Sequence, residues 1–289
     1  MDNKDFIKTG LTGTGMFVSS SEAGNLLKND IDASTNPEAF FEKQPAPFIV
    51  GQNAVLHKAS TRGHVNHGWL DSHHTFSFGS YYDADRMHFG ALRVLNDDRV
   101  DAGMGFGKHP HDNMEIISIP LEGDLEHQDS MGNVAVIKKG DIQVMSAGTG
   151  ITHSEYNRNP DQLTKFLQIW VYPNKKNVKP RYHQVTLNET DRRNRLQQIL
   201  SPDPNDEGVW IHQDAWFHLG SFDRNFALDY NIKKQGNGVY AFVLRGRFAI
   251  GDVLLDERDG FGIWDVASFP LTAKSEDAEI LLMEVPMSM

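Results

Sequence analysis

The segment Lys108-His109-Pro110-His111-Asp112-Asn113-Met114-Glu115 contains the densest group of metal-binding side chains in the chain. Successive side chains of an extended segment point to opposite faces, so His109 and His111 project from the same face. Glu115, further along, can share that face if the extended segment continues. Two imidazoles with a common direction predict a strand that contributes to a metal site.

A second segment, later in the chain, repeats this arrangement. It reads Gly150-Ile151-Thr152-His153-Ser154-Glu155-Tyr156-Asn157, so His153 and Glu155 also lie on one face of a predicted strand. A single His-x-His sequence often occurs by chance, whereas two such pairs, each preceded by glycines, indicate ligands that converge. Three imidazoles and a carboxylate, without sulfur, predict one divalent transition-metal ion per chain.

The composition narrows the class of protein. The chain has 289 residues, a formal net charge of −11 and no cysteine. The absence of cysteine excludes disulfides, thiolate nucleophiles and sulfur-bound zinc or iron. The acidic balance argues against nucleic-acid binding and favours small-molecule partners. Without a long apolar run or a signal peptide at Met1–Asp5, we expect a cytoplasmic protein that does not associate with membranes.

The pattern along the chain predicts an extension followed by two domains. Residues 1–50 are rich in Gly, Ser, Thr, Asn and Asp and have weak apolar periodicity, which predicts an N-terminal extension. Residues 51–185 contain short alternating apolar segments separated by glycine turns, as in Ile116-Ile117-Ser118-Ile119 before Glu122-Gly123. This pattern is typical of an antiparallel sandwich or barrel.

Residues 186–289 are predicted to form a second domain of the same kind. They begin with a predicted helix over Asp191–Leu200 and continue with strand patterns. Asp259-Gly260-Phe261 parallels Gly140-Asp141-Ile142 of the first half, which indicates a weak internal repeat. The second half has neither of the paired histidine motifs, so we expect no metal in it.

The remaining histidines and aromatic residues receive less specific predictions. His127 could orient a ligand imidazole, although the sequence favours a solvated strand end. The histidines before the first motif lack a paired context, so we expect ordinary structural or surface roles for His64, His67, His73, His74 and His88. The candidates for the wall of a ligand cavity are Phe76, Phe78, Phe106 and Met145.

Taken together, these segments resemble the two sequence motifs of cupins and, in more detail, the pirin family. His109-Pro110-His111 with Glu115 and Gly123 is similar to the first motif, and Gly140 to Gly148 followed by His153 is similar to the second. Both spacings are slightly longer than the general cupin pattern. The resemblance is specific from about residue 66 to residue 182, and it implies an all-β bicupin with two antiparallel β-barrel (jelly-roll) domains packed together.

The resemblance also implies a ligand set. The general cupin pattern nominates Glu115 as the acidic ligand, whereas the pirin pattern nominates Glu155, together with His109, His111 and His153. We expect Glu155 to be both a ligand and the catalytic proton acceptor. The implied ion is iron(II), with Cu, Mn, Co, Ni and Zn as alternatives that the same ligands suit.

An activity follows from the resemblance as well. Several family members are quercetin 2,3-dioxygenases, which open the central ring of a flavonol with dioxygen, and others act as nuclear co-regulators. The implied partners are therefore a small aromatic substrate and dioxygen, with a monomer or weak homo-oligomer as the assembly. A metal-dependent binding or redox-sensing regulatory protein without turnover is the main alternative, and an isomerase on the same fold is another.

Overall fold

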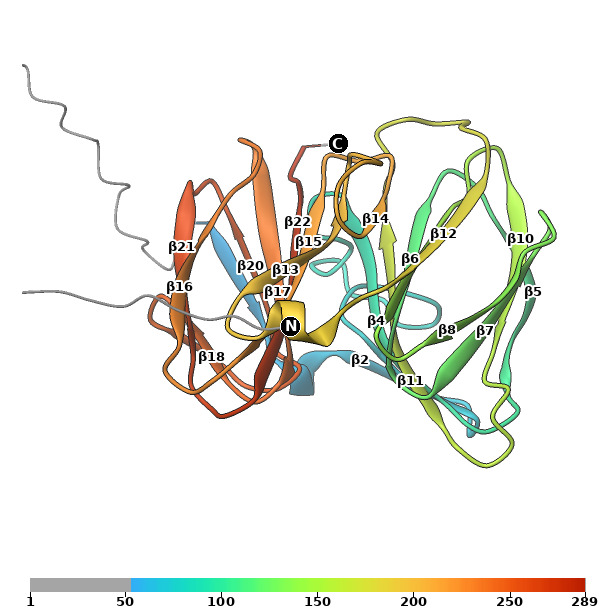
Figure 1. Cartoon of the computed structure of the whole chain (residues 1–289), viewed down its shortest axis with the longest axis horizontal. Helices are drawn as coiled ribbons and strands as arrows, with labels where there is room; N and C mark the ends of the chain where they lie inside the picture. Colours follow the sequence, from blue (N-terminus) through green and yellow to red (C-terminus); the bar gives the residue numbers. More distant parts are fainter. Residues whose placement is uncertain (1–52, 289) are drawn as a thin grey trace, which may run out of the picture. The chain divides into compact units, whose positions relative to one another are not determined.

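The computed structural model describes residues 53–288, so the predicted extension over residues 1–50 lies outside the described residues. These residues form two halves that lie side by side (Figure 1), and each half consists of two β-sheets. Two short 3-10 helices accompany the strands, η1 (Ala59–Thr61) and η2 (Glu189–Arg192). The predicted all-β fold with two jelly-roll domains is confirmed, although the sheets of each half stack without closing into a continuous barrel.

The first half contains a seven-stranded and a four-stranded sheet, both antiparallel. The larger sheet has, in spatial order, β12 (Arg181–Thr186), β9 (Asp141–Ser146), β6 (Glu115–Glu122), β11 (Thr164–Val171), β4 (Leu92–Val100), β3 (Leu70–His74) and β2 (Gly63–Asn66). The smaller sheet has β5 (Gly105–His111), β10 (Ile151–Tyr156), β7 (Asp124–Asp129) and β8 (Val134–Lys138). The predicted metal-binding motifs thus lie on neighbouring strands, β5 and β10.

The second half repeats this layout. Its larger sheet has β1 (Ala54–His57), β20 (Gly260–Trp264), β17 (Asn237–Arg245), β22 (Ala278–Pro286), β15 (Trp216–Phe222), β13 (Leu196–Ser201) and β14 (Val209–Trp210). Its smaller sheet has β16 (Ala227–Asn231), β21 (Ser268–Ala273), β18 (Phe248–Ile250) and β19 (Val253–Leu255). β1 precedes the first half in sequence but pairs with β20, so the second half incorporates a strand from the start of the described chain.

The two halves share one apolar core. The central strands of the larger sheets are buried on both faces, which explains why β6 and β17 have nearly continuous apolar sequences. One cluster of buried side chains contains Leu95 and Ile117 of the first half together with Phe217 and Phe242 of the second. The hydrophobic effect therefore drives the association of the halves as well as the packing within each.

The interiors of the two halves differ. The second half is filled mainly by one apolar cluster that includes Phe248, Phe261 and Phe269, beside a small buried polar group in which Glu284 accepts hydrogen bonds from Tyr230 and Asn237. In the first half, the apolar side chains form two small clusters, one around Leu125 and one around Met145. Polar side chains occupy the rest of that interior, and a polar interior between two packed sheets indicates a functional site.

The helix predicted over Asp191–Leu200 is wrong. Only the short η2 forms, and Leu196–Ser201 becomes strand β13. Asn194 has a φ of 53°, in the left-handed region that ends a helical turn. β13 then pairs with β15, where Leu196 lies opposite Gly220, so pairing with a neighbouring strand overrides the helical propensity of the arginine-rich sequence.

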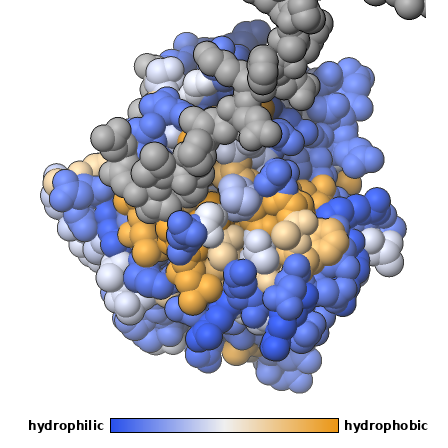
Figure 2. Space-filling model, turned by 90° about the vertical axis from the view of Figure 1, so that its left-hand side faces the viewer, coloured by the Kyte–Doolittle hydropathy of each residue, from blue (hydrophilic) through white to orange (hydrophobic). Residues whose placement is uncertain are grey.

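The surface is mostly hydrophilic. Figure 2 shows the side of the molecule on which the second half lies, where a band of hydrophobic residues crosses a largely hydrophilic face. Individual exposed apolar side chains such as Leu254, with 50% exposure, are normal for a folded domain. No helix in the part of the chain that the structure describes is long and apolar enough to cross a membrane.

The shared core gives a first prediction. Phe217 is fully buried in the cluster between the halves, so Phe217→Ala should lower the free energy of unfolding by about 3–5 kcal/mol through the cavity it leaves. Tyr82→Ala, at a position with 74% exposure, is the matched control and should change it by less than about 0.5 kcal/mol. Urea denaturation measures both, and equal effects would contradict a core that spans the halves.

His57 gives a second prediction, on pH. Burial lowers its pKa to about 4, and its Nδ1 lies 2.8 Å from the Tyr240 hydroxyl, which joins β1 to β17. Below pH 6.5 the unfolded chain binds a proton at this histidine while the folded chain does not, so stability falls as the pH drops from about 6.5 towards 4. At pH 4.5 this difference in pKa should lower the free energy of unfolding by about 2.5 kcal/mol, and His57→Gln should flatten the pH dependence of urea denaturation by that amount. If the free energy of unfolding of His57→Gln depends on pH as steeply as that of the wild type, His57 does not cause the loss of stability at low pH.

Candidate metal centre

The pairing of β5 with β10 brings three histidines together. The two strands are antiparallel, with His109 directly opposite His153 and His111 opposite Ile151. The ring centroids of His109 and His153 are 4.4 Å apart, and those of His111 and His153 are 4.9 Å apart. One ligand nitrogen from each of the three lies within 4.8 Å of the other two. The predicted convergence of His109, His111 and His153 is therefore present.

The chemistry of these nitrogens fits a metal ion. Nε2 of His111 and Nε2 of His153 are buried and have no hydrogen-bond partner among the described residues. Nδ1 of His109 donates to the carbonyl oxygen of Gly107 at 2.8 Å, which leaves Nε2 as the free lone pair. Burial lowers the pKa of His111 to about 4 and that of His153 to about 3, so both imidazoles are neutral near pH 7, as ligation requires.

Glu155 lies next to this group on β10. A β-bulge falls between His153 and Glu155, and the carboxylate is 2% exposed. Its Oε1 accepts from the Ser118 hydroxyl at 3.0 Å, and its Oε2 accepts from Nε2 of Gln168 at 2.8 Å. Donor atoms of Glu155, His153 and His127 lie within 4.8 Å of one another, so His153 belongs both to this group and to the three-histidine group. Glu155 is thus a buried carboxylate held by neutral donors beside the histidines.

Glu115 lies elsewhere, because the chain turns before it. β5 ends at His111, and Asn113 has a φ of 45°, so Glu115 begins β6 in the other sheet. Its Oε2 accepts from the Ser146 hydroxyl at 2.6 Å, and burial raises its pKa to about 7. The expectation that Glu115 shares the face of His109 and His111 is wrong, since it assumed an extended segment without the turn at Asn113.

His127 is buried rather than solvated. The sequence favoured a solvated strand end, but β7 pairs with β10 in the smaller sheet and His127 lies on its buried face. Nε2 of His127 lies 3.2 Å from Oδ2 of Asp129, and its Nδ1 lies 3.5 Å from Nδ1 of His153. A carboxylate and an imidazole therefore support His153 from behind, an arrangement that commonly orients metal-binding histidines. The spacing of His127 and Asp129 on one strand face was the signal that could have identified this pair.

A tight turn positions the start of β10. Gly148 has a φ of 48°, and a Cβ at this position would lie 2.0 Å from the carbonyl oxygen of Val178. Only glycine combines this backbone conformation with so close an approach. The glycine-rich sequence before His153 is therefore required by the geometry that delivers β10 to the site.

A cavity of about 210 Å³ lies near the candidate centre, but its lining includes none of His109, His111, His153 and Glu155. Phe78 and Phe106 form part of its wall. Phe106 lies opposite Glu155 in the pairing of β5 with β10, and the ring of Phe78 contacts Trp170, whose ring in turn contacts His111 at 4.8 Å. These contacts place an aromatic wall next to the histidines.

The same cavity has a polar side. Asp98 accepts from the Ser72 hydroxyl, and burial raises the pKa of Asp98 to about 7. Oδ1 of Asn96 and Nδ1 of His74 are buried without a hydrogen-bond partner in the described chain. Unpaired buried polar atoms are costly unless water or a ligand binds them, so this wall can bind hydroxyl groups.

Two of the four predicted cavity residues lie outside this cavity. Phe76 belongs to the core between the halves, where its ring contacts Tyr240, because its strand region faces the second half. Met145 packs with Ile116 in a small apolar cluster that Trp170 borders. Phe78 and Phe106 line the cavity as predicted.

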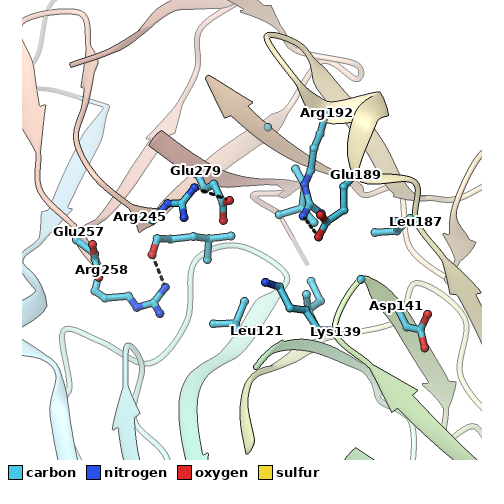
Figure 3. A pocket seen from close by; sticks show the side chains of 15 residues that line it. Leu121, Lys139, Asp141, Leu187, Glu189, Arg192, Arg245, Glu257, Arg258 and Glu279 are labelled. Atoms are coloured by element: carbon cyan, nitrogen blue, oxygen red, sulfur yellow. Dashed lines mark hydrogen bonds and ion pairs between the residues drawn. The ribbon is translucent and has the colours of Figure 1, made fainter. Parts of the chain in front are cut away.

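A larger cleft of about 480 Å³ lies at the seam between the halves (Figure 3). Charged side chains line it, but Arg192 pairs with Glu189 at 2.8 Å and Arg245 pairs with Glu279 at 3.1 Å. Lys139 points into the same space. The cleft holds no histidine among its lining residues, and its acids and bases largely neutralise one another. We therefore place the metal chemistry in the first half.

The histidine group gives a third prediction. His111→Ala should remove the metal that wild-type protein retains through dialysis against a mild chelator, because it leaves two imidazoles on this face. Elemental analysis should find about one ion per chain in the wild type and in the control His88→Ala, whose Nδ1 instead contacts the Gly90 carbonyl at 2.9 Å. If His111→Ala retains all of its metal, the three histidines are not the site that holds the metal through dialysis.

Comparison with known proteins agrees with this architecture. The family profile described as Pirin matches residues 55–171, and the profile described as the quercetinase C-terminal cupin domain matches residues 198–285. The bacterial pirin YhhW from Escherichia coli, solved in complex with nickel(II), is 43% identical. It superposes with a TM-score of 0.76 over 81% of this chain and 99% of that chain.

Two curated relatives extend the comparison. A quercetin 2,3-dioxygenase of Escherichia coli K12 is 44% identical over 231 residues, which cover 80% of this chain and 98% of that protein. A pirin-like protein of Caulobacter vibrioides is 39% identical and is covered over 95% of its length, with 77% of this chain aligned. Since the matches span both halves, the chain belongs to the pirin family.

Proposed function

We propose that this protein is a metal-dependent dioxygenase that opens the central ring of a flavonol such as quercetin. The observation that carries the proposal is the group of three imidazoles with two buried, unpaired Nε2 atoms, next to a buried carboxylate. An aromatic cavity lies nearby, although these four side chains do not line it. A relative 44% identical to this chain is named quercetin 2,3-dioxygenase, which supports the substrate class.

In this proposal His109, His111, His153 and Glu155 hold one divalent ion. The ligand set contains only nitrogen and oxygen, which suits iron(II) and also nickel, copper, manganese, cobalt and zinc. We retain iron(II) as the first candidate, while the nickel(II) complex of a relative supports the same class of ion. When bound, the ion supplies a Lewis acid for the flavonol oxygen and a centre for its reaction with dioxygen.

Glu155 is the proposed fourth ligand and proton acceptor. It lies two residues from His153 on the same strand, whereas Glu115 begins a strand of the other sheet. The donors Ser118 and Gln168 fix the carboxylate in position without neutralising its charge. A carboxylate with this support can receive the proton of the flavonol hydroxyl, which makes the ring electron-rich for oxygenation.

The cavity beside the centre supplies the rest of the substrate site. Its volume of about 210 Å³ equals about seven water molecules at ~30 Å³ each, which is the scale of one aromatic ring. We propose that Phe78 and Phe106 contact one ring of the flavonol, while Asn96 and Asp98 bind its hydroxyl groups. The remainder of the substrate then extends towards the opening, and its apolar surface excludes water from the reacting atoms.

A fourth prediction separates the two glutamates. Glu155→Gln should lower quercetin turnover by roughly 10²-fold or more, the scale of a lost general base, while the shape of the side chain is preserved. Glu115→Gln is the matched control, because it makes the same change at a buried carboxyl away from the histidines, and its turnover should change much less. Oxygen consumption under air and elemental analysis of each variant are the measurements. If Glu115→Gln instead lowers both the turnover rate and the metal content more than Glu155→Gln does, then Glu115 is the ligand and proton acceptor.

The same assay tests the function itself. Metal-loaded wild-type protein should consume dioxygen in proportion to quercetin, and His111→Ala should not. If loaded protein binds quercetin without consuming oxygen, a metal-dependent binding or regulatory protein is the better description.

A further inference from the structure

A second group of metal-binding side chains lies on the hairpin of β2 and β3, at the edge of the larger sheet. His64 on β2 is directly opposite His73 on β3, and Asp71 precedes His73 by two residues on the same face. The two imidazole rings stack with centroids 4.5 Å apart and planes 16° apart. All three side chains are partly exposed, so an ion from solvent can reach them.

The donor atoms are already close to a ligand geometry. Nε2 of His64 lies 2.8 Å from Oδ1 of Asp71, and Nδ1 of His73 lies 3.8 Å from the same oxygen. Ligands held at about 2.0–2.2 Å from an ion in tetrahedral or octahedral geometry are roughly 3.0–3.5 Å from one another. One donor atom from each residue lies within 4.8 Å of the others, as in the three-histidine group. Because the two rings are stacked, they must rotate out of the stack before their in-plane lone pairs and the carboxylate can meet on one ion.

Among the described residues Asp71 makes no arginine ion pair, although Arg99 lies opposite it on β4. The ion pairs that Asp71 makes within the described chain are with these two histidines. The nearby arginines have other acidic partners. Arg62 pairs with Asp97 at 3.2 Å, and Arg99 pairs with Asp101 at 3.8 Å. The carboxylate of Asp71 is thus available to a divalent ion.

We propose that His64, Asp71 and His73 form a second, surface metal site for a divalent ion of the zinc and copper class. Two imidazoles and one carboxylate leave coordination positions for water, and such mixed nitrogen and oxygen donors suit these ions. The site is separate from the candidate centre, because Ser72 and His74, the alternate residues of β3, point into the buried interior. An ion here would join the edge strand β2 to β3, and it would stabilise the folded chain by binding it and not the unfolded chain.

Zinc titration of the full-length chain by calorimetry tests this proposal. Protein whose central site is already loaded should bind one further zinc ion per chain, and the melting temperature should rise with zinc concentration. His73→Ala and Asp71→Asn should each weaken this second binding at least about tenfold, since loss of even a supporting residue costs 10–100-fold at other metal sites. The control His67→Ala removes an exposed histidine from the same hairpin and should leave it unchanged.

A second measurement separates this site from the central one. In a variant with both His111→Ala and His153→Ala, the surface site should still bind one ion, and copper(II) should give an electron paramagnetic resonance spectrum coupled to two imidazole nitrogens. When His73→Ala is added to this variant, the spectrum should show coupling to only one imidazole nitrogen. The proposal is overturned if loaded wild-type protein binds no further zinc, or if the variant His64→Ala/His73→Ala binds it as tightly. Neither result depends on dioxygenase activity.

Discussion

The antiparallel pairing of β10 with both β5 and β7 is the constraint on which the candidate centre depends. Because β10 is flanked on both sides, His153 lies opposite His109 on one neighbour and opposite Asp129 on the other. A shift of one residue in either register would turn the side chains to the other face of the sheet. The histidine group, the supporting imidazole of His127 and the position of Glu155 therefore follow from one register.

The polar interior of the first half lowers the free energy of unfolding, so apolar burial elsewhere in the molecule has to offset it. Buried groups such as Asp98, Asn96 and Glu155 cost free energy unless hydrogen bonds or a ligand satisfy them. The second half has the same strand layout, its interior is mostly apolar with one small polar group around Glu284, and its larger sheet shares a core with the first half. The second half thus contributes apolar burial that offsets the polar interior of the first, although it contains neither of the paired histidine motifs.

The sequence predicted those features that depend on local periodicity. Alternation within His109-Pro110-His111 and His153-Ser154-Glu155 was sufficient to place the histidines on common faces, and the glycine turns predicted the stacked sheets. Local periodicity could not predict features that depend on where the chain turns back or on which strands pair. Glu115 was misplaced because one positive φ at Asn113 starts a new strand, and the helix over Asp191–Leu200 was wrong because β15 offered a pairing partner. Burial of His127 likewise requires knowing that β7 lies beside β10.

Glu155 and Glu115 are the same residue type, and their positions in the fold distinguish them. Both are buried carboxyls that accept a hydrogen bond from a serine, Ser118 for Glu155 and Ser146 for Glu115. Glu155 additionally accepts from Gln168, and its carboxylate lies within 4.8 Å of a ring nitrogen of His153. Glu115 instead accepts from the backbone of His212 and lies near Arg181, and burial raises its pKa to about 7. The turn at Asn113 therefore decides which glutamate lies beside the histidines, because it sends Glu115 into the other sheet.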